Sequence, residues 1–230
     1  MEKRYKHILF DADNTLFDFD AAEKNAFLSL STINGEVFCE DNYSLYHEIN
    51  DSAWKRLERG EITKTQLKTL RFAELYRVLS RDEKQGEIER VVESYPRFLS
   101  RGTDLIDGAL ETVKKLSHDY DLYIITNGLY DVQSARFAAS ELVPYIKVLF
   151  ISEKIGYEKP SRQYFDHVLA AVGDSKRENY LVVGDSLTSD IDGAVGASID
   201  CVFFDKKGSG VGTRRPTYTI TNISHLVGIV

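Results

Sequence analysis

Two aspartates stand two positions apart in the segment Asp11-Ala-Asp13-Asn-Thr15, directly after a short apolar run. Residues two positions apart on an extended chain point to the same side, so both carboxylates can face one site. A close pair of like charges with oxygen ligands favours a hard cation such as Mg²⁺. Turns and helix caps have the same composition, so this segment alone leaves both interpretations open.

Three further segments carry side chains of types that bind phosphate or metal. Thr126-Asn127-Gly128 offers a hydroxyl, an amide and a glycine whose bare backbone allows close approach. Lys159-Pro160 offers an ammonium that can neutralise phosphoryl charge, and Gly184-Asp185 with Asp190 offers two more carboxylates. Each of these segments alone is also typical of a turn, a helix cap or a solvated lysine.

The polar segments come after apolar runs that predict buried strands. The runs are His7 to Phe10, Leu122 to Ile125, Val148 to Ile151, Tyr180 to Val183 and Cys201 to Phe204. Helical patterns lie between the later four, the clearest being the stripe of Phe165, Val168, Leu169 and Val172. Strands that alternate with helices predict an α/β fold with a Rossmann-like parallel sheet.

Ligands of an open parallel sheet bind beyond the carboxyl ends of its strands. The four polar segments would therefore meet at one edge of the sheet, which turn chemistry alone does not explain. Together they supply a nucleophilic carboxylate, a second carboxylate for proton transfer, phosphate-binding donors, a lysine and metal ligands. This set predicts metal-assisted phosphoryl transfer through an aspartyl phosphate.

A long insertion separates the first predicted strand from the second. The gap is about 110 residues, whereas a βαβ crossover needs only about 30. Within it we predict four amphipathic helices, the third opened by a Thr63-Lys-Thr-Gln66 capping box. The apolar stripes of the first two helices are Ala22, Ala26, Leu30 and Ile33, ending at Gly35, and Leu45, Ile49, Ala53 and Leu57, ending at Gly60. The sequence thus predicts a discontinuous core domain of residues 1–16 and 101–230 and an inserted helical bundle of residues 17–100. Aromatic residues of this bundle, such as Trp54 and Phe72, could stack on the base of a bound ligand. At helical spacing, we expect them to pack in the core of the bundle instead.

In its motifs the sequence resembles the haloacid dehalogenase superfamily, over nearly the whole chain. The four motifs of that superfamily match Asp11-Ala-Asp13-Asn14-Thr15, Thr126-Asn127, Lys159-Pro160, and Gly184-Asp185 with Asp190. The inserted helices look like the superfamily's type 1 cap. The resemblance implies that the enzyme hydrolyses phosphate esters with the help of Mg²⁺.

The same resemblance implies a role for each motif residue. Asp11 would attack phosphorus, while Asp13 would protonate the leaving oxygen and later deprotonate the hydrolytic water. The Asp11 carboxylate, the Asp13 backbone carbonyl and Asp185 would bind Mg²⁺. Thr126 and Asn127 would bind phosphoryl oxygens. Lys159 would bridge Asp11 and the phosphate. Asp190 would support Lys159 or a metal-bound water.

Three stretches are similar to a narrower branch, the pyrimidine 5′-nucleotidases that act on non-standard nucleoside monophosphates. They run from Trp54 to Phe72, from Ile124 to Gly128 and from Ile151 to Gly156. The substrate implied is a pyrimidine nucleoside 5′-monophosphate. Sugar-phosphate phosphatase and phosphomutase activities stay open, because both chemistries use the same pair of aspartates.

Two other functions fit the sequence less well. A phospho-accepting receiver domain places its acceptor after the third strand, where this chain has no aspartate before Lys159, and it has no helical insertion. Dehalogenation has no use for Asp13, whose proton suits an alkoxide leaving group. The segment Gly208-Ser-Gly210-Val-Gly212 lacks the spacing of a dinucleotide-binding loop and is expected to be a surface loop.

Composition narrows the range of partners and the compartment. The chain has 29 Lys+Arg against 36 Asp+Glu and a formal net charge of −7, the wrong sign for holding a nucleic-acid backbone. Two distant cysteines, Cys39 and Cys201, form neither a disulfide framework nor a metal knuckle. No apolar run is long enough for a membrane span or signal peptide. We expect a cytoplasmic enzyme, monomeric or homodimeric, that acts on a small phosphate ester.

Overall fold

The computed structural model describes residues 4–82 and 86–230, and the chain divides into two compact units. Unit 1 consists of Met1–Phe19 and Thr103–Val230, and unit 2 is Asp20–Gly102. Residues 1–3 of the predicted core domain and residues 83–85 of the predicted bundle lie outside the described residues. In the described part of the chain, no helix is long and apolar enough to cross a membrane.

Unit 1 contains a parallel sheet of six strands in the order β3-β2-β1-β4-β5-β6, so the predicted α/β fold is confirmed. The strands are β1 His7–Asp11, β2 Asp121–Thr126, β3 Val148–Ile151, β4 Tyr180–Gly184, β5 Asp200–Phe204 and β6 Tyr218–Ile220. Strand β1 is central and pairs with both β2 and β4. The sequence did not predict β6, because this edge strand has only three residues and one buried side chain.

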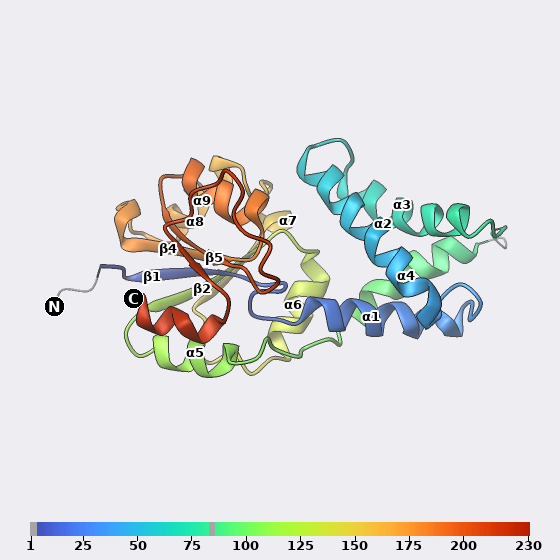
Figure 1. Ribbon diagram of the computed structural model, residues 1–230, viewed down its shortest axis with the longest axis horizontal. Coiled ribbons are helices and arrows are strands. Elements are labelled where there is room, and N and C mark those ends of the chain that lie inside the picture. The colour runs from blue at the N-terminus through green and yellow to red at the C-terminus, as the bar shows by residue number, and fades with distance from the viewer. Residues whose placement is uncertain (1–3, 83–85) are drawn as a thin grey trace. The chain divides into compact units, whose positions relative to one another are not determined.

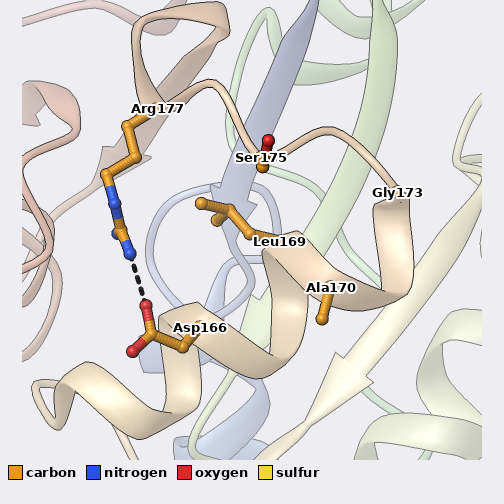
Figure 2. Close-up of a pocket in the computed structure, with 6 residues that line it drawn as sticks. All are labelled: Asp166, Leu169, Ala170, Gly173, Ser175 and Arg177. Carbon is orange, nitrogen blue, oxygen red and sulfur yellow. Dashed lines mark hydrogen bonds and ion pairs between the residues drawn. The ribbon is translucent and has the colours of Figure 1, made fainter.

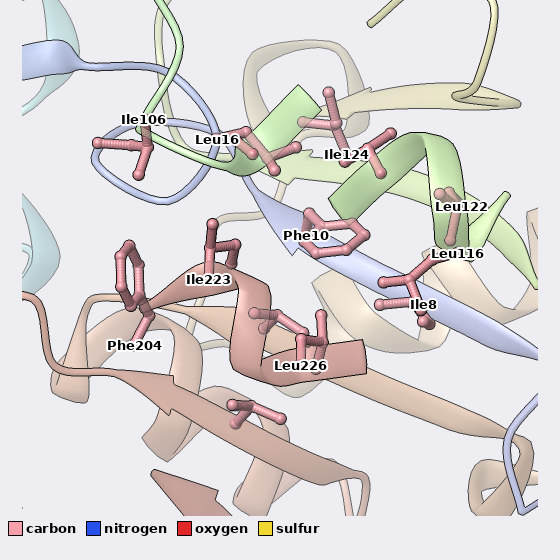
Figure 3. Packing of buried hydrophobic residues seen from close by; sticks show 14 of the residues in the cluster. Ile8, Phe10, Leu16, Ile106, Leu116, Leu122, Ile124, Phe204, Ile223 and Leu226 are labelled. Carbon is pink, nitrogen blue, oxygen red and sulfur yellow. The ribbon is translucent and has the colours of Figure 1, made fainter. Parts of the chain in front are cut away.

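Helices cover both faces of the sheet (Figure 1). They are α5 Ala109–Leu116, α6 Tyr130–Ala138, α7 Ser152–Ile155, α8 Arg162–Val172, α9 Asp192–Gly196, and the short turns η2 Arg177–Asn179, η3 Leu187–Ile191 and η4 Ile223–Gly228. Alternate residues of β1 point to opposite faces: Ile8 and Phe10 pack toward α5 and η4 (Figure 3), and Leu9 packs toward α8. The sheet is therefore buried on both sides, as a parallel sheet requires.

The predicted surface loop after β5 is confirmed, since residues 206–210 are exposed and form neither helix nor strand. Its start is fixed by Asp205, whose carboxylate accepts hydrogen bonds from the backbone of Ser209 and Gly210 at 2.8 Å each. Cys201 is buried in the sheet core and Cys39 is half-buried, both as free thiols.

Unit 2 is helical, with α2 Glu40–Glu58, α3 Lys64–Val78 and α4 Glu87–Leu99 following α1 Phe19–Ser29 and the turn η1 Leu30–Thr32. The capping box at Thr63 forms: its hydroxyl accepts from the Gln66 backbone at 3.2 Å, and its backbone donates to the Gln66 side chain at 2.8 Å. The predicted helices are therefore present. The first one ends earlier than predicted, before Ile33.

The first half of the buried face of α2 is shifted by one position from the predicted stripe, whereas Ala53 and Leu57 are buried as predicted. Leu45 and Ile49 are half-buried, whereas Tyr46 and Asn50 are buried. Asn50 is drawn inward because its amide donates to the buried Glu23 carboxylate at 2.5 Å and its carbonyl accepts from Arg71 at 3.0 Å. A polar network inside the bundle thus sets the helix rotation, which an apolar stripe does not reveal.

The aromatic residues of unit 2 form much of its core. Tyr46 stacks on Phe27 and Phe72, with ring centroids 4.8 and 5.4 Å apart. Tyr76 is also buried, while Tyr43 and Trp54 are half-buried.

Candidate active site

Lys159 joins three of the predicted motifs at the carboxyl ends of β1, β2 and β4. Its Nζ donates to Asp11 Oδ1 at 2.6 Å, to Asp190 Oδ1 at 2.7 Å and to the backbone carbonyl of Ile125 at 3.0 Å. These partners use all three donors of the ammonium. The segments that follow separate strands are thus brought to one place, as the sheet topology leads us to expect.

The position of Lys159 is set by a reciprocal pair of hydrogen bonds with Asn127. The Asn127 amide donates to the Lys159 carbonyl at 2.8 Å, and its Oδ1 accepts from the Lys159 backbone N–H at 2.9 Å. The Asn127 side chain therefore holds the lysine backbone in addition to any contact with phosphate. The second motif positions the third, which the sequence pattern did not indicate.

The charges around Lys159 oppose its burial. Burial alone would lower the pKa of this lysine, but the carboxylates of Asp11 and Asp190 outweigh it and raise the pKa above its usual range. Lys159 is 2% exposed and Asp190 is fully buried. The ammonium therefore stays charged, and its field keeps negative charge stable at this edge of the sheet.

Three carboxylates form a cluster that suits a hard cation. One ligand oxygen each from Asp11, Asp185 and Asp190 lie within 4.8 Å of one another. Burial raises the pKa of Asp11 to about 7, although the Lys159 ammonium opposes this rise. Burial and the neighbouring carboxylates raise the pKa of Asp185 well above its usual value. A bound divalent cation would remove this penalty, and an oxygen-only donor set fits Mg²⁺.

The backbone at Gly184 lets Asp190 reach the cluster. A Cβ atom at Gly184 would lie 2.2 Å from Asp190 Oδ2, too close for any side chain. The Asp190 carboxylate is also held by the Ser186 backbone N–H, which donates to Oδ2 at 3.1 Å. Position 184 must therefore be glycine for the Asp190 side chain to occupy its place.

The Asp13 carboxylate has different partners from that of Asp11. Its Oδ2 accepts from the Gln133 amide at 2.5 Å, and its Oδ1 accepts from the Arg136 guanidinium. The Asp13 carboxylate still lies near Asp11, because its charge contributes to the raised pKa of Asp11. The expectation that the two carboxylates serve one site stays a prediction. The predicted metal contact of Asp13 was through its backbone carbonyl, and it stays a prediction.

Thr126 is buried at the end of β2, and its Oγ1 accepts from the Gly128 backbone at 3.0 Å. Gly128 itself is needed for Gln133, since a Cβ there would lie 2.2 Å from the Gln133 amide nitrogen. The close approach that this glycine allows is therefore made by a side chain of α6. The predicted contact of Thr126 with phosphate stays a prediction.

Sequence reasoning missed Gln133 and Arg136 as residues of the site. They stand three positions apart on α6, and both are buried. Two polar residues on the buried face of a short helix are the signal that could have indicated them, because such groups need buried partners.

A surface pocket of about 370 Å³ lies elsewhere in unit 1 (Figure 2). It is lined by the end of α8 and the loop before β4, where Arg177 bonds Asp166 at 2.5 Å. That loop enters the sheet at the amino end of β4, opposite the carboxyl ends that carry Lys159 and the aspartates. The pocket therefore takes no part in the candidate site.

Comparisons with known proteins agree with the motifs. The model of the haloacid dehalogenase-like hydrolases matches residues 5–198. The HAD-hydrolase YfnB of Bacillus subtilis is 35% identical, over 99% of this chain and 96% of its own. A structure of YfnB bound to magnesium superposes with a TM-score of 0.91 at 34% identity, covering 99% of each chain.

Two further relatives have named activities. Pyrimidine 5′-nucleotidase PynA of Streptococcus pneumoniae is 34% identical, over 97% of this chain and 94% of its own. Pyrimidine 5′-nucleotidase YjjG of Escherichia coli is 28% identical, over 97% and 96%. With its motifs gathered at the sheet edge and its family model matched over most of its length, the chain belongs to the haloacid dehalogenase-like hydrolase family.

Proposed function

We propose that this hydrolase is a Mg²⁺-dependent phosphatase that works through an aspartyl phosphate on Asp11 and acts on pyrimidine nucleoside 5′-monophosphates. The observation that carries the proposal is the contact of Lys159 with Asp11. A buried ammonium 2.6 Å from a carboxylate, beside two more carboxylates, suits attack on a phosphoryl group whose charge needs neutralising.

The residues present fit a magnesium ion. Asp11 and Asp185 would hold it through their carboxylates and Asp13 through its backbone carbonyl, while Asp190 either reaches the ion or supports Lys159. When bound, the ion would neutralise phosphoryl oxygens and orient them for in-line displacement. Burial is the main cause of the raised pKa of Asp11 and Asp185, and a bound divalent cation would offset this cost of burying their charge, which supports the assignment.

In the first step, an Asp11 oxygen forms a bond to phosphorus as the bond to the leaving oxygen breaks. Asp13 supplies the proton that the leaving alkoxide needs. Thr126 and Asn127 hold the phosphoryl oxygens, and Lys159 contacts one of these oxygens in exchange for one of its three present hydrogen bonds. In the second step, Asp13 takes a proton from water, which attacks phosphorus and frees both Asp11 and inorganic phosphate. Asp13 loses one proton in the first step and regains one in the second, so the two steps together leave its protonation state unchanged.

We assign the choice of substrate to unit 2, which would act as a cap domain. The chain leaves unit 1 at Phe19 and returns at Thr103. Next to these two crossings, the backbone N–H of Asp18 donates to the backbone carbonyl of Asp104 at 2.9 Å, close in sequence to the nucleophile loop. An insertion at this point can select the leaving group without changing the phosphate chemistry. PynA and YjjG, which share nearly the whole length of this chain, support a pyrimidine nucleotide.

Steady-state kinetics with Mg²⁺ on a panel of phosphate esters tests this proposal. UMP, dUMP and dTMP should be hydrolysed with higher kcat/KM than AMP or GMP. With ribose 5-phosphate, which has no base, kcat should be lower and KM higher than with UMP, because contacts to the remote base stabilise the transition state. An Asp11→Asn preparation is the control for contaminating phosphatase. Equal kcat/KM for ribose 5-phosphate and UMP would leave a phosphatase of other specificity.

A further inference from the structure

The Asp13 carboxylate is held from outside its own loop, by two side chains of α6. We propose that Gln133 and Arg136 are positioning residues, a clamp that orients Asp13 for proton transfer to and from the substrate. This inference rests on the proposed function, in which Asp13 is the acid and base. It assigns to α6 a part in the reaction that the four motifs do not contain.

The clamp engages both oxygens of the carboxylate. Gln133 Nε2 donates to Oδ2 at 2.5 Å and the guanidinium of Arg136 donates to Oδ1. Each carboxylate oxygen can accept two hydrogen bonds, so a site for a substrate proton remains on each. The side chain is thus fixed in direction while it keeps the capacity to give and take a proton.

The clamp itself is rigid, because it is built into the core. Arg136 is fully buried, and its guanidinium lies 4.8 Å from the ring centroid of Phe17. Phe17 follows Asp13 in the loop after β1. Gln133 is 3% exposed and packs over Gly128 of the second motif. Asp13, by contrast, has a side chain that is 25% exposed. The partly exposed acid is therefore oriented by buried partners.

Lys159 and the carboxylate cluster do not provide this orientation. The Lys159 ammonium donates its three hydrogen bonds to Asp11, Asp190 and the Ile125 carbonyl. The cation cluster is built from Asp11, Asp185 and Asp190. The nucleophile and the acid are thus held by separate sets of side chains. A defect in the clamp should disturb proton transfer while leaving the nucleophile and the carboxylate ligands of the metal in place.

A double-mutant cycle tests the clamp with UMP as substrate. Arg136→Met should lower kcat by about 100-fold, since misplacing a reacting group by an ångström has an effect of this size. KM should change by less than about threefold, because ground-state binding is not touched. In an Asp13→Asn background, adding Arg136→Met should lower kcat by no more than about twofold, because the clamp acts only through the Asp13 carboxylate.

A merely structural role for Arg136 gives a different result. If Arg136 only anchored the loop, the fold-decreases in kcat caused by Arg136→Met and by Asp13→Asn would multiply in the double variant. That outcome overturns the proposal, and a wild-type kcat in Arg136→Met also overturns it. Failure of the proposed function is recognised separately, because Asp13→Asn alone would then keep its activity.

Two further variants guard against a folding defect. Gln133→Met keeps Arg136 and removes one hydrogen bond, so kcat should fall by about tenfold, and this loss should also vanish in the Asp13→Asn background. Arg177→Met is the matched control, because Arg177 also pairs with an aspartate of unit 1 but lines the remote pocket of Figure 2. It should leave kcat unchanged. An intact kcat in Gln133→Met, with Arg136→Met unfolded, would refute the clamp.

Discussion

Replacing Lys159 with methionine removes a buried charge while keeping a side chain of similar length. In the native protein the ammonium lies 2.6 Å from Asp11 and 2.7 Å from Asp190, with almost no exposure to solvent. The variant would leave two neighbouring carboxylates without their cation. It should therefore be less stable than the wild type, and the loss should depend on pH.

The size of the loss follows from the burial of the pair. Removing one partner of a buried ion pair destabilises a protein by about 3–5 kcal/mol. The carboxylates limit this loss by binding protons. The pKa of Asp11 is already raised to about 7 by burial, and without the ammonium it rises further.

The direction with pH follows from linkage. A carboxyl whose pKa is higher in the folded than in the unfolded protein favours folding at low pH, and this contribution is lost as pH rises toward the folded pKa. The destabilisation by Lys159→Met should therefore be larger at pH 8 than at pH 5, by about 1 kcal/mol, because a further rise of the Asp11 pKa separates the variant from the wild type only between pH 7 and pH 8.

Urea denaturation of the metal-free proteins at pH 5 and pH 8 measures this difference. Lys147→Met is the matched control, because Lys147 also lies 2.6 Å from an aspartate but its side chain is 58% exposed. That control should change the free energy of unfolding by no more than about 0.5 kcal/mol at either pH. A Lys159→Met loss below about 1 kcal/mol at pH 8, or one equal at both pH values, would refute the electrostatic reasoning.

Three more predictions concern the metal and the backbone around it. Mg²⁺ affinity, measured by titration calorimetry, should rise up to about tenfold per pH unit below pH 7 and level off above it, because the ion displaces a proton from Asp11; a flat profile would argue against Asp11 as a ligand. Asp185→Ala should fold and should lose Mg²⁺-induced thermal stabilisation, whereas retained stabilisation would place the ion elsewhere. Gly184→Ala should lower the free energy of unfolding by about 1–3 kcal/mol, because its Cβ would lie 2.2 Å from Asp190, and a neutral effect in denaturant titration would contradict that geometry.

The strands and the motif positions were predictable because each depends on a local pattern. Apolar runs such as Tyr180 to Val183 define strands by themselves, and parallel pairing then fixes which ends meet. The meeting of Lys159 with Asp11 followed from that topology alone. The short edge strand β6 was missed because an edge strand needs few apolar residues to pair.

The partners of the motif residues were not predictable, because they depend on packing between distant elements. Asn127 bonds the Lys159 backbone, and Asp13 is bound by α6, over separations in sequence of 32 residues and of 120 or more. The rotation of α2 was set by the buried pair of Glu23 and Asn50. A single sequence shows that such polar groups need partners, but it does not show which ones.

The most direct test of the account is to locate the phosphoryl group on the protein. Asp13→Asn should still accept phosphate from an aryl phosphate, whose leaving group needs no proton, but should hydrolyse the intermediate slowly. After rapid acid quench in the presence of Mg²⁺, peptide mass spectrometry should find one phosphoryl group on the peptide that contains Asp11, and none in the double variant that also carries Asp11→Asn. Phosphate release without any such peptide, or a phosphoryl group on another residue, would contradict the central claim.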